Sequence, residues 1–258
     1  MPYEYDEFKN YPTFVEVEPK IRALLEPKDT IVAGHATQND VKYLNLECKR
    51  FNLPSFSFSF ADTQFLYMNK IGEFSRQFGL SKIAEEMGVE FLPHRAVDDA
   101  YATMKIAEAM CKGEGCNFSE LFEKYEVTLG KIENYEVAQN TSVALKKYLA
   151  ELKRKKEERE RIRVAFHNYI DKAKRRRKKD GKLKGKRVCF SHSLVLEFDR
   201  AKALALKVFE QGGFYAYHAE ESDYYIYLEG ESGQRIKSAE ANRARLLLAD
   251  ELEAYLEE

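Results

Sequence analysis

Two short segments hold side chains of the types that carry out chemistry in active sites. In the first, Gly34-His35-Ala36-Thr37-Gln38-Asn39-Asp40, a histidine and a carboxylate follow a short apolar run. In the second, His94-Arg95-Ala96-Val97-Asp98-Asp99-Ala100, another histidine precedes two carboxylates. Carboxylate oxygens bind hard divalent cations, and a histidine takes up or releases a proton near neutral pH. Both segments are therefore candidates for a catalytic or metal-binding site.

The elements around the first segment indicate where its carboxylate lies. Residues 30–34 (TIVAG) form an apolar run of strand length, and residues 56–61 (FSFSFA) alternate with a period of two. Helix formers occupy the stretch from Asp40 to Cys48 between them. This order predicts a strand–helix–strand unit, the right-handed crossover of an α/β sheet. Asp40 would then lie just beyond the carboxyl end of a strand, where such sheets place their sites.

The second segment opens a helix predicted from about Arg95 to Cys111. His94 and Asp99 are five residues apart, so on one helix they would diverge by about 140°. We therefore expect His94 to lie on the entering loop and to fold back toward the face that carries Asp99. Two further helices are predicted, one starting with Pro19 at its first position and one over residues 80–87.

Several other polar residues have a structural interpretation. Asp62 follows the second strand and is expected to cap the next helix, and His35 to hydrogen-bond its own loop. Asp40 can be interpreted as a cap as well as a ligand. Cys111 and Cys116 can be a metal half-site or incidental thiols, and the second is favoured because no other ligand pair has matching spacing. The four cysteines form no CxxC pair and predict reduced thiols in a cytoplasmic protein.

The two segments resemble motifs of the DEDDh 3′–5′ exonucleases, the proofreading-subunit and ribonuclease T type with a ribonuclease H-like fold. The family pattern His-x(4)-Asp ends here at Asp40, and His-x-Ala-x-x-Asp-Ala matches residues 94–100. The resemblance covers roughly Phe14–Cys111. It implies phosphodiester hydrolysis by two Mg²⁺ or Mn²⁺ ions, with Asp40 and Asp99 as metal ligands and His94 as the general base.

The chain departs from this family at the first motif. An Asp-x-Glu pair should precede the helix at Pro19, but the segment Tyr3–Phe8 (YEYDEF) lacks that spacing. Two of four carboxylates are then missing, and we expect an N-terminally truncated or incomplete enzyme that cannot assemble the metal site alone. The alternative is a catalytically inactive adaptor that binds nucleic acid or protein on the same scaffold. With only two strand candidates, we also expect one bare sheet edge.

A strongly basic segment follows this region. The net charge of the chain is −1, yet residues 151–187 hold 18 Lys and Arg against 6 Asp and Glu. A long helical pattern starts at Ser142 and closes on a basic run. That run is either a solvated helix face or a contact for a nucleic-acid backbone. Its members are Arg175, Arg176, Arg177, Lys178 and Lys179.

The last 75 residues predict a small α/β domain with the order strand, helix, strand, strand, helix, strand, helix. It resembles a BRCT module over about Gly185–Leu256, through Gly-Lys-Arg-Val-Cys-Phe-Ser at its first strand and Gly212-Gly213 before its second. The resemblance implies that Ser191 and Lys237 bind phosphate. A protein-docking domain with an empty pocket is the other interpretation.

The length of 258 residues predicts about two domains. We expect an α/β protein with a ribonuclease H-like exonuclease domain at residues 1–112, a helical basic linker at 113–184 and a BRCT-like domain at 185–258. It would act on nucleic-acid ends in repair or replication. No apolar window is long enough to predict a membrane span. A structural coiled coil is disfavoured because the apolar stripes are short and interrupted.

Overall fold

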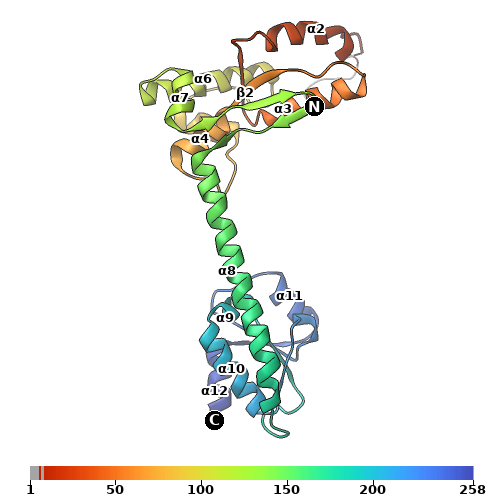
Figure 1. Cartoon of the computed structure of the whole chain (residues 1–258), viewed down its shortest axis with the longest axis vertical. Coiled ribbons are helices and arrows are strands. Elements are labelled where there is room, and N and C mark those ends of the chain that lie inside the picture. The colour runs from red at the N-terminus through yellow and green to blue at the C-terminus, as the bar shows by residue number, and fades with distance from the viewer. Residues whose placement is uncertain (1–5, 7–8, 258) are drawn as a thin grey trace. The chain divides into compact units, whose positions relative to one another are not determined.

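The computed structural model describes residues 6 and 9–257, which fall into two compact units, Met1–Glu151 and Leu152–Glu258 (Figure 1). The boundary lies inside helix α8 (Val143–Ala173). The first unit thus extends well past residue 112, and the second begins well before residue 185. Both units mix helices with a four-stranded sheet. None of the described helices is long and apolar enough to cross a membrane.

The strand–helix–strand unit is confirmed in the first unit. Strands β1 (Ile31–Gly34) and β2 (Phe58–Asp62) pair in parallel, and helix α3 (Gln38–Arg50) connects them. Their last residues are aligned, with Gly34 opposite Asp62. The carboxyl ends of both strands therefore reach the same edge of the sheet, next to the start of α3.

The sheet of the first unit has two strands beyond the two predicted, and both come from residues after 112. Strands β4 (Gly130–Glu133) and β5 (Glu136–Ala138) add to β2 as an antiparallel hairpin, which gives the order β1-β2-β4-β5. A separate two-stranded ladder joins β3 (Val127–Thr128) to β6 (Thr141–Ser142). In the described part of the chain, β1 pairs only with β2.

Helix α2 (Phe14–Leu25) starts five residues before the predicted position, so Pro19 lies inside it. The early start has a local cause, because the Thr13 N–H donates to the Glu16 carboxylate at 2.7 Å and this capping interaction fixes the first turn. Helices α5 (Leu80–Met87) and α6 (Ala96–Glu114) agree with the sequence within a few residues. The unit also contains α4 (Thr63–Ile71), which follows Asp62, and α7 (Phe118–Lys124).

The sheet of the first unit has a core on each face. Phe58 and Phe60 of β2 are buried on the face covered by α2 and α3. Ala61, the next residue, belongs to the cluster formed with α4, α5, α6 and α7. Successive side chains of a strand point to opposite faces, so β2 contributes to both cores and lies in the middle of the unit.

The second unit contains a four-stranded parallel sheet of order β10-β9-β7-β8. Its strands are β7 (Arg187–Phe190), β8 (Phe214–Tyr215), β9 (Tyr224–Tyr227) and β10 (Arg245–Leu248). Its helices are α9 (His192–Leu196), α10 (Phe198–Glu210), α11 (Gln234–Ala241) and α12 (Ala249–Glu257), with a 3₁₀ turn η2 (Ala219–Glu221). The predicted order of elements is confirmed, with α9 as an addition.

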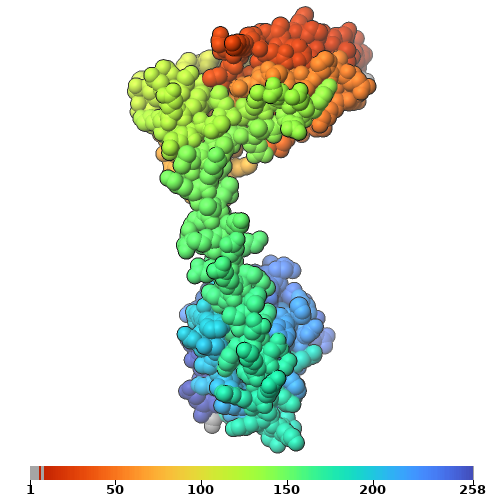
Figure 2. Space-filling model, in the orientation of Figure 1, coloured from red at the N-terminus to blue at the C-terminus, as the bar shows by residue number. Residues whose placement is uncertain are grey.

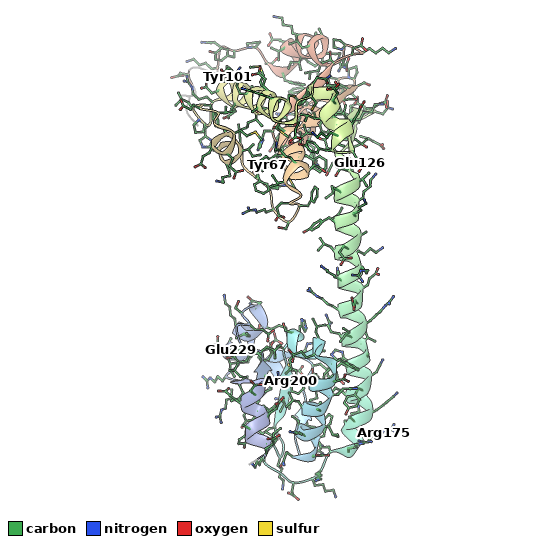
Figure 3. The ribbon with its side chains drawn as sticks, turned by 90° about the vertical axis from the view of Figure 1, so that its left-hand side faces the viewer. Tyr67, Tyr101, Glu126, Arg175, Arg200 and Glu229 are labelled. Carbon is green, nitrogen blue, oxygen red and sulfur yellow. The ribbon has the colours of Figure 1, made fainter. Side chains whose placement is uncertain are left out.

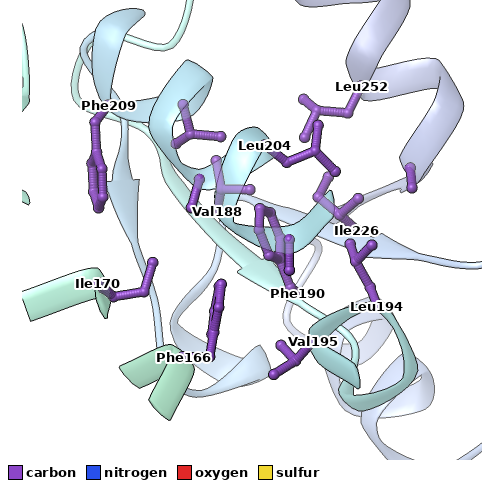
Figure 4. Close-up of a cluster of buried hydrophobic side chains, with 14 of the residues drawn as sticks. Phe166, Ile170, Val188, Phe190, Leu194, Val195, Leu204, Phe209, Ile226 and Leu252 are labelled. Carbon is purple, nitrogen blue, oxygen red and sulfur yellow. The ribbon is translucent and has the colours of Figure 1, made fainter. Parts of the chain in front are cut away.

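The last turns of α8 are part of the core of this unit. Figure 4 shows Phe166 and Ile170 of α8 beside Val188 and Phe190 of β7 and the helices α10 and α12. Phe166 is completely buried. The intervening strand residue, Cys189, faces the other side with α11. The region expected to be a linker therefore supplies part of the hydrophobic core.

Before this buried stretch, α8 carries residues 152–161, which are all exposed (Figure 2). After it, the helix tightens into the 3₁₀ turn η1 (Lys174–Arg176). Arg175 projects from this end of the helix (Figure 3), and it is exposed together with Arg176, Lys178 and Lys179. The basic run thus lies on the surface at the end of a helix, where its charge also complements the helix dipole.

Candidate functional site

The first unit contains a cavity of about 740 Å³ at the carboxyl end of β1. The N-terminal ends of α3, α5 and α6 form its other walls. Asp40, His94 and Asp99 all line it, although they come from two segments more than fifty residues apart. The fold therefore brings the three residues singled out from the sequence to one site.

Asp40 lies in the first turn of α3. Partial desolvation by the cavity walls raises the pKa of its carboxyl group above the usual value, and a hydrogen bond from its own backbone N–H opposes this shift. A nearby cation would favour the charged form and lower that pKa again. The environment of Asp40 is thus one in which a carboxylate gains from binding a positive charge.

His94 occupies the loop before α6, with a left-handed backbone φ of 71°. Its N–H donates to Asp99 Oδ1 at 3.3 Å, so the loop turns back onto the helix as predicted. Asp99 lies in the first turn of α6 and its carbonyl accepts a hydrogen bond from the Thr103 hydroxyl at 2.8 Å. His94 is exposed to solvent.

Asp62 caps the next helix, as predicted, whereas His35 hydrogen-bonds Thr63 and Phe78 from other segments and not its own loop. The Asp62 carboxylate caps α4 by accepting the Gln64 N–H at 2.9 Å, and it also accepts the Ala36 N–H at 3.0 Å. Burial raises its pKa. His35 Nε2 donates to the Phe78 carbonyl at 3.0 Å, and burial lowers the pKa of its imidazole. These bonds fix the loop that leads from β1 into α3.

Thr37 is a further positioning residue, which the sequence did not single out. Its side chain is 3% exposed and its hydroxyl donates to the Ala61 carbonyl at 2.8 Å. A Cβ on Gly34 would lie 2.8 Å from the Thr37 hydroxyl oxygen. The glycine at the end of β1 therefore permits the close approach that ties α3 to β2. In the sequence, the only feature that indicates this role of Thr37 is Gly34 at the end of the strand.

The described residues do not complete a metal centre. Within residues 6 and 9–257, no three His, Cys, Asp or Glu side chains come close enough to hold a metal ion. Asp40 and Asp99 have the oxygen ligands that Mg²⁺ and Mn²⁺ prefer, but two carboxylates do not complete the coordination shell of such an ion. The expected position of further acids, Tyr3–Phe8, lies mostly outside the described residues.

Ser191 and Lys237, the residues expected to bind phosphate in the second unit, have different surroundings. Ser191 is 2% exposed and caps α9, accepting the Leu194 N–H at 3.1 Å. Lys237 is exposed on α11 and lines none of the cavities described. A different cavity in this unit, of about 310 Å³, is lined by two arginines and three histidines that the sequence did not single out. They are Arg163, His167, His192, His218 and Arg235.

Among comparisons with known proteins, one finds a match, and it lies in the first unit. A family model described as exonuclease matches residues 4–107. The chain therefore carries an exonuclease-type domain at its N-terminus, within a mixed α/β fold. This domain assignment implies nuclease chemistry and a nucleic-acid substrate. No curated protein and no solved structure matches the chain.

Proposed function

We propose that the protein is a 3′–5′ exonuclease of the DEDDh type that hydrolyses phosphodiesters at nucleic-acid ends. One observation carries this proposal: Asp40, His94 and Asp99 line a single cavity within the segment that matches the exonuclease family. His94 would act as the general base, since this exposed histidine stands on a loop fixed against Asp99. Asp40 and Asp99 would contribute oxygen ligands to divalent cations, together with acids beyond those described.

A non-catalytic adaptor is the second candidate, and a specific observation favours it. The described carboxylates around the cavity do not form a metal-holding cluster. Such an adaptor would bind nucleic acid in the same cavity and leave it intact.

The two candidates differ in what happens to a substrate with a 3′ overhang. For the exonuclease, the full chain should release nucleotides in the presence of Mg²⁺ or Mn²⁺, and His94→Ala should slow release by about 10²–10⁴-fold. Asp99→Ala should abolish it, because a carboxylate ligand is lost. For the adaptor, the full chain should bind the substrate without forming products.

The neighbouring carboxylate provides a matched control. Asp98 belongs to the same helical turn but pairs with Arg95 at 3.7 Å and does not line the cavity. Asp98→Ala should therefore keep most of the activity. Release at the wild-type rate by both His94→Ala and Asp99→Ala would overturn the site assignment.

For the second unit we propose a BRCT-like docking domain. Its support is a parallel sheet of four strands with helices on both faces, in the order of elements that the sequence predicts. The exposed basic run Arg175–Lys179 would add contacts with a nucleic-acid backbone. Ser191 caps α9 as an acceptor, which leaves its hydroxyl proton able to donate to a phosphate.

A further inference from the structure

Two of the four cysteines lie together at the C-terminal end of α6, the helix whose first turn carries Asp99. Cys111 and Cys116 are half-buried, and both pack against the core cluster shared with α4, α5 and α7. Cys48 and Cys189 are fully buried and belong to other clusters. Cys111 and Cys116 are therefore the two cysteines that combine a common location with partial access to solvent.

The end of α6 brings these two residues side by side. Gly115 has a left-handed φ of 66° and reverses the chain. The Cys116 N–H then donates to the Cys111 carbonyl at 3.1 Å, and the Gly115 N–H donates to the Lys112 carbonyl at 3.4 Å. This pair of hydrogen bonds defines a Schellman motif, in which the side chains of the residues joined by the outer bond frequently touch. Here those residues are Cys111 and Cys116.

The outer hydrogen bond also limits how far apart the two residues lie. Its length of 3.1 Å and standard backbone dimensions keep the two Cα atoms within about 7 Å of each other. Disulfides span Cα separations of about 4.4–6.8 Å. Burial, and then the charge of the Cys116 sulfur, raises the pKa of the Cys111 thiol, so the two side chains are electrostatic neighbours as well. The pair is thus within reach of a disulfide.

The segment that carries Cys116 is fixed on both sides. Before it, Glu114 pairs with Lys70 of α4 at 2.6 Å and with Lys124 of α7 at 2.7 Å. After it, Asn117 caps α7 with its side chain. Groups that are already held in position lose little entropy when a bond forms between them. Closure of a disulfide is therefore favoured by the fold around it.

We propose that Cys111 and Cys116 form a redox-sensitive pair, which hydrogen peroxide oxidises to a disulfide within one chain. The inference goes beyond the proposed nuclease function and does not depend on it, because neither cysteine lines the candidate cavity. Cys48 and Cys189 belong to core clusters that hold no second cysteine. These two should stay reduced under conditions that oxidise the pair.

The oxidation takes place in two steps. Burial raises the pKa of Cys111 and keeps it as a thiol, so we assign the first step to Cys116. Its thiolate attacks one peroxide oxygen, so that an S–O bond forms, the O–O bond breaks and hydroxide leaves. The Cys111 sulfur then attacks the sulfenic sulfur, which forms the S–S bond and releases the oxygen as water. In total, the two thiols lose two electrons and two protons, and one peroxide becomes two waters.

The experiment treats the folded full chain with hydrogen peroxide, removes the oxidant, and blocks the remaining thiols after unfolding. Free thiols should fall from four per chain to two. Trypsin cleaves after Lys112, between the two cysteines, so the disulfide should join the peptides 106–112 and 113–124. The joined product should weigh two hydrogen atoms less than the separate peptides and should disappear on reduction with dithiothreitol.

Two variants test the roles of the thiols. Cys111→Ser removes the partner that closes the bond, so Cys116 should stay as a sulfenic acid that dimedone labels, and no joined peptide should form. Cys48→Ala removes a thiol outside the pair and is the matched control. It should give the joined peptide in the same yield as the unchanged chain. Loss of the joined peptide in both variants would contradict the assignment to Cys111 and Cys116.

An equal mixture of ordinary and isotope-labelled unchanged chains tests the intramolecular bond without any substitution. The joined peptides should be wholly light or wholly heavy. Joined peptides with one light and one heavy part would show a bond between two chains and would overturn the proposal. So would four free thiols after peroxide treatment, or loss of Cys48 and Cys189 at the same rate as Cys111 and Cys116.

Discussion

At the scale of single residues, polar side chains with similar sequence contexts have different roles. Asp62 and Asp40 both follow strands, yet Asp62 is engaged by three backbone N–H groups and Asp40 faces a cavity. His35 is fastened at both ring nitrogens, whereas His94 is exposed. A group whose hydrogen bonds are already made stabilises the loop, and one that faces a cavity is available to a ligand.

The carboxylate of Glu114 makes the free energy of unfolding depend on pH in the acidic range. Glu114 contacts Lys70 at 2.6 Å and Lys124 at 2.7 Å, and hydrogen bonds from Lys124 and then Lys70 lower its pKa to about 2. Because the folded pKa lies below the unfolded one, this stabilisation is present above about pH 4.5 and is lost as the pH falls toward 2. Glu114→Gln should flatten the decline of the unfolding free energy between pH 5 and 2.

Denaturant titrations at a series of pH values measure this slope. Glu123→Gln, an exposed change on the neighbouring helix α7, serves as the reference. If the two variants lose stability with acid along the same curve as the unchanged chain, the lysines do not stabilise the ionised Glu114.

The residue scale also shows where sequence reasoning stops. Asp40, His94 and Asp99 could be selected because their spacing fits a motif, and the structure brings them together. The sequence singled out Lys237 on α11, but Arg235 is the residue of that helix that lines the cavity of about 310 Å³ in the second unit. Two positions on a helix differ by about 200° in direction, so the choice between them depends on how α11 packs. The place of Arg163 in the lining of that cavity could not be predicted at all, since it requires α8 to dock on a distant strand.

At the scale of elements, strongly patterned segments were predicted and weakly patterned ones were not. Strands β1 and β2 are apolar or alternating, and α5 and α6 end at glycines. The hairpin β4–β5 consists of short strands with Lys131 and Glu133 on one face. Such strands form because β2 offers a partner edge, which is a tertiary effect.

Gly130 is essential for that hairpin. It pairs with Phe60 in the register between β4 and β2, and a Cβ there would lie 2.3 Å from the Phe60 ring. Phe60 is fully buried and cannot move aside. Gly130→Ala should therefore lower the free energy of unfolding by about 1–3 kcal/mol through overpacking.

Thermal or denaturant unfolding of the variant measures this change. Gly113→Ala is the matched control, because Gly113 lies in helix α6 and a Cβ there would meet only Lys70 Nζ at 3.7 Å. It should be neutral or stabilising by about 0.5–1 kcal/mol. Equal effects of the two substitutions would contradict the packing argument.

The basic run at the end of α8 is expected to make nucleic-acid binding depend on the salt concentration. Arg175, Arg176 and Lys178 are exposed and free to approach phosphates. Each phosphate neutralised on a duplex contributes about −0.9 to the slope of log K against log salt. Replacing Arg175 and Arg176 by Gln should reduce the magnitude of that slope. Affinities measured across a salt series test it, and an unchanged slope would make the run a solvated helix end.

At the scale of the whole molecule, both units include residues of the segment that was expected to link two domains. Leu121, Phe122 and Ile132 are buried in the cores of the first unit, although all three follow residue 112. Phe166, Ile170 and Leu183 are buried in the second unit, although all three precede residue 185. The presence of two folded units could be predicted from the length of the chain. Their boundaries could not, because those depend on which side chains the folded sheets cover.

The second boundary can be tested with fragments of the chain. A fragment of residues 152–258 holds the whole cluster around Phe166 and Phe190 and should unfold in one cooperative transition. A fragment of residues 185–258 lacks Phe166, which is completely buried, and exposes the apolar residues it covers. Losing one such side chain costs about 3–5 kcal/mol, a large share of the 5–15 kcal/mol typical of a domain.

Substitutions within the longer fragment separate this packing from chain length. Phe166→Ala should lower its free energy of unfolding by about 3–5 kcal/mol. Val164→Ala, at an exposed position on the same helix, should change it by less than about 0.5 kcal/mol. Circular dichroism during urea unfolding measures both. A fragment of residues 185–258 as stable as the longer one would show that α8 only rests on the second unit and is not part of its core.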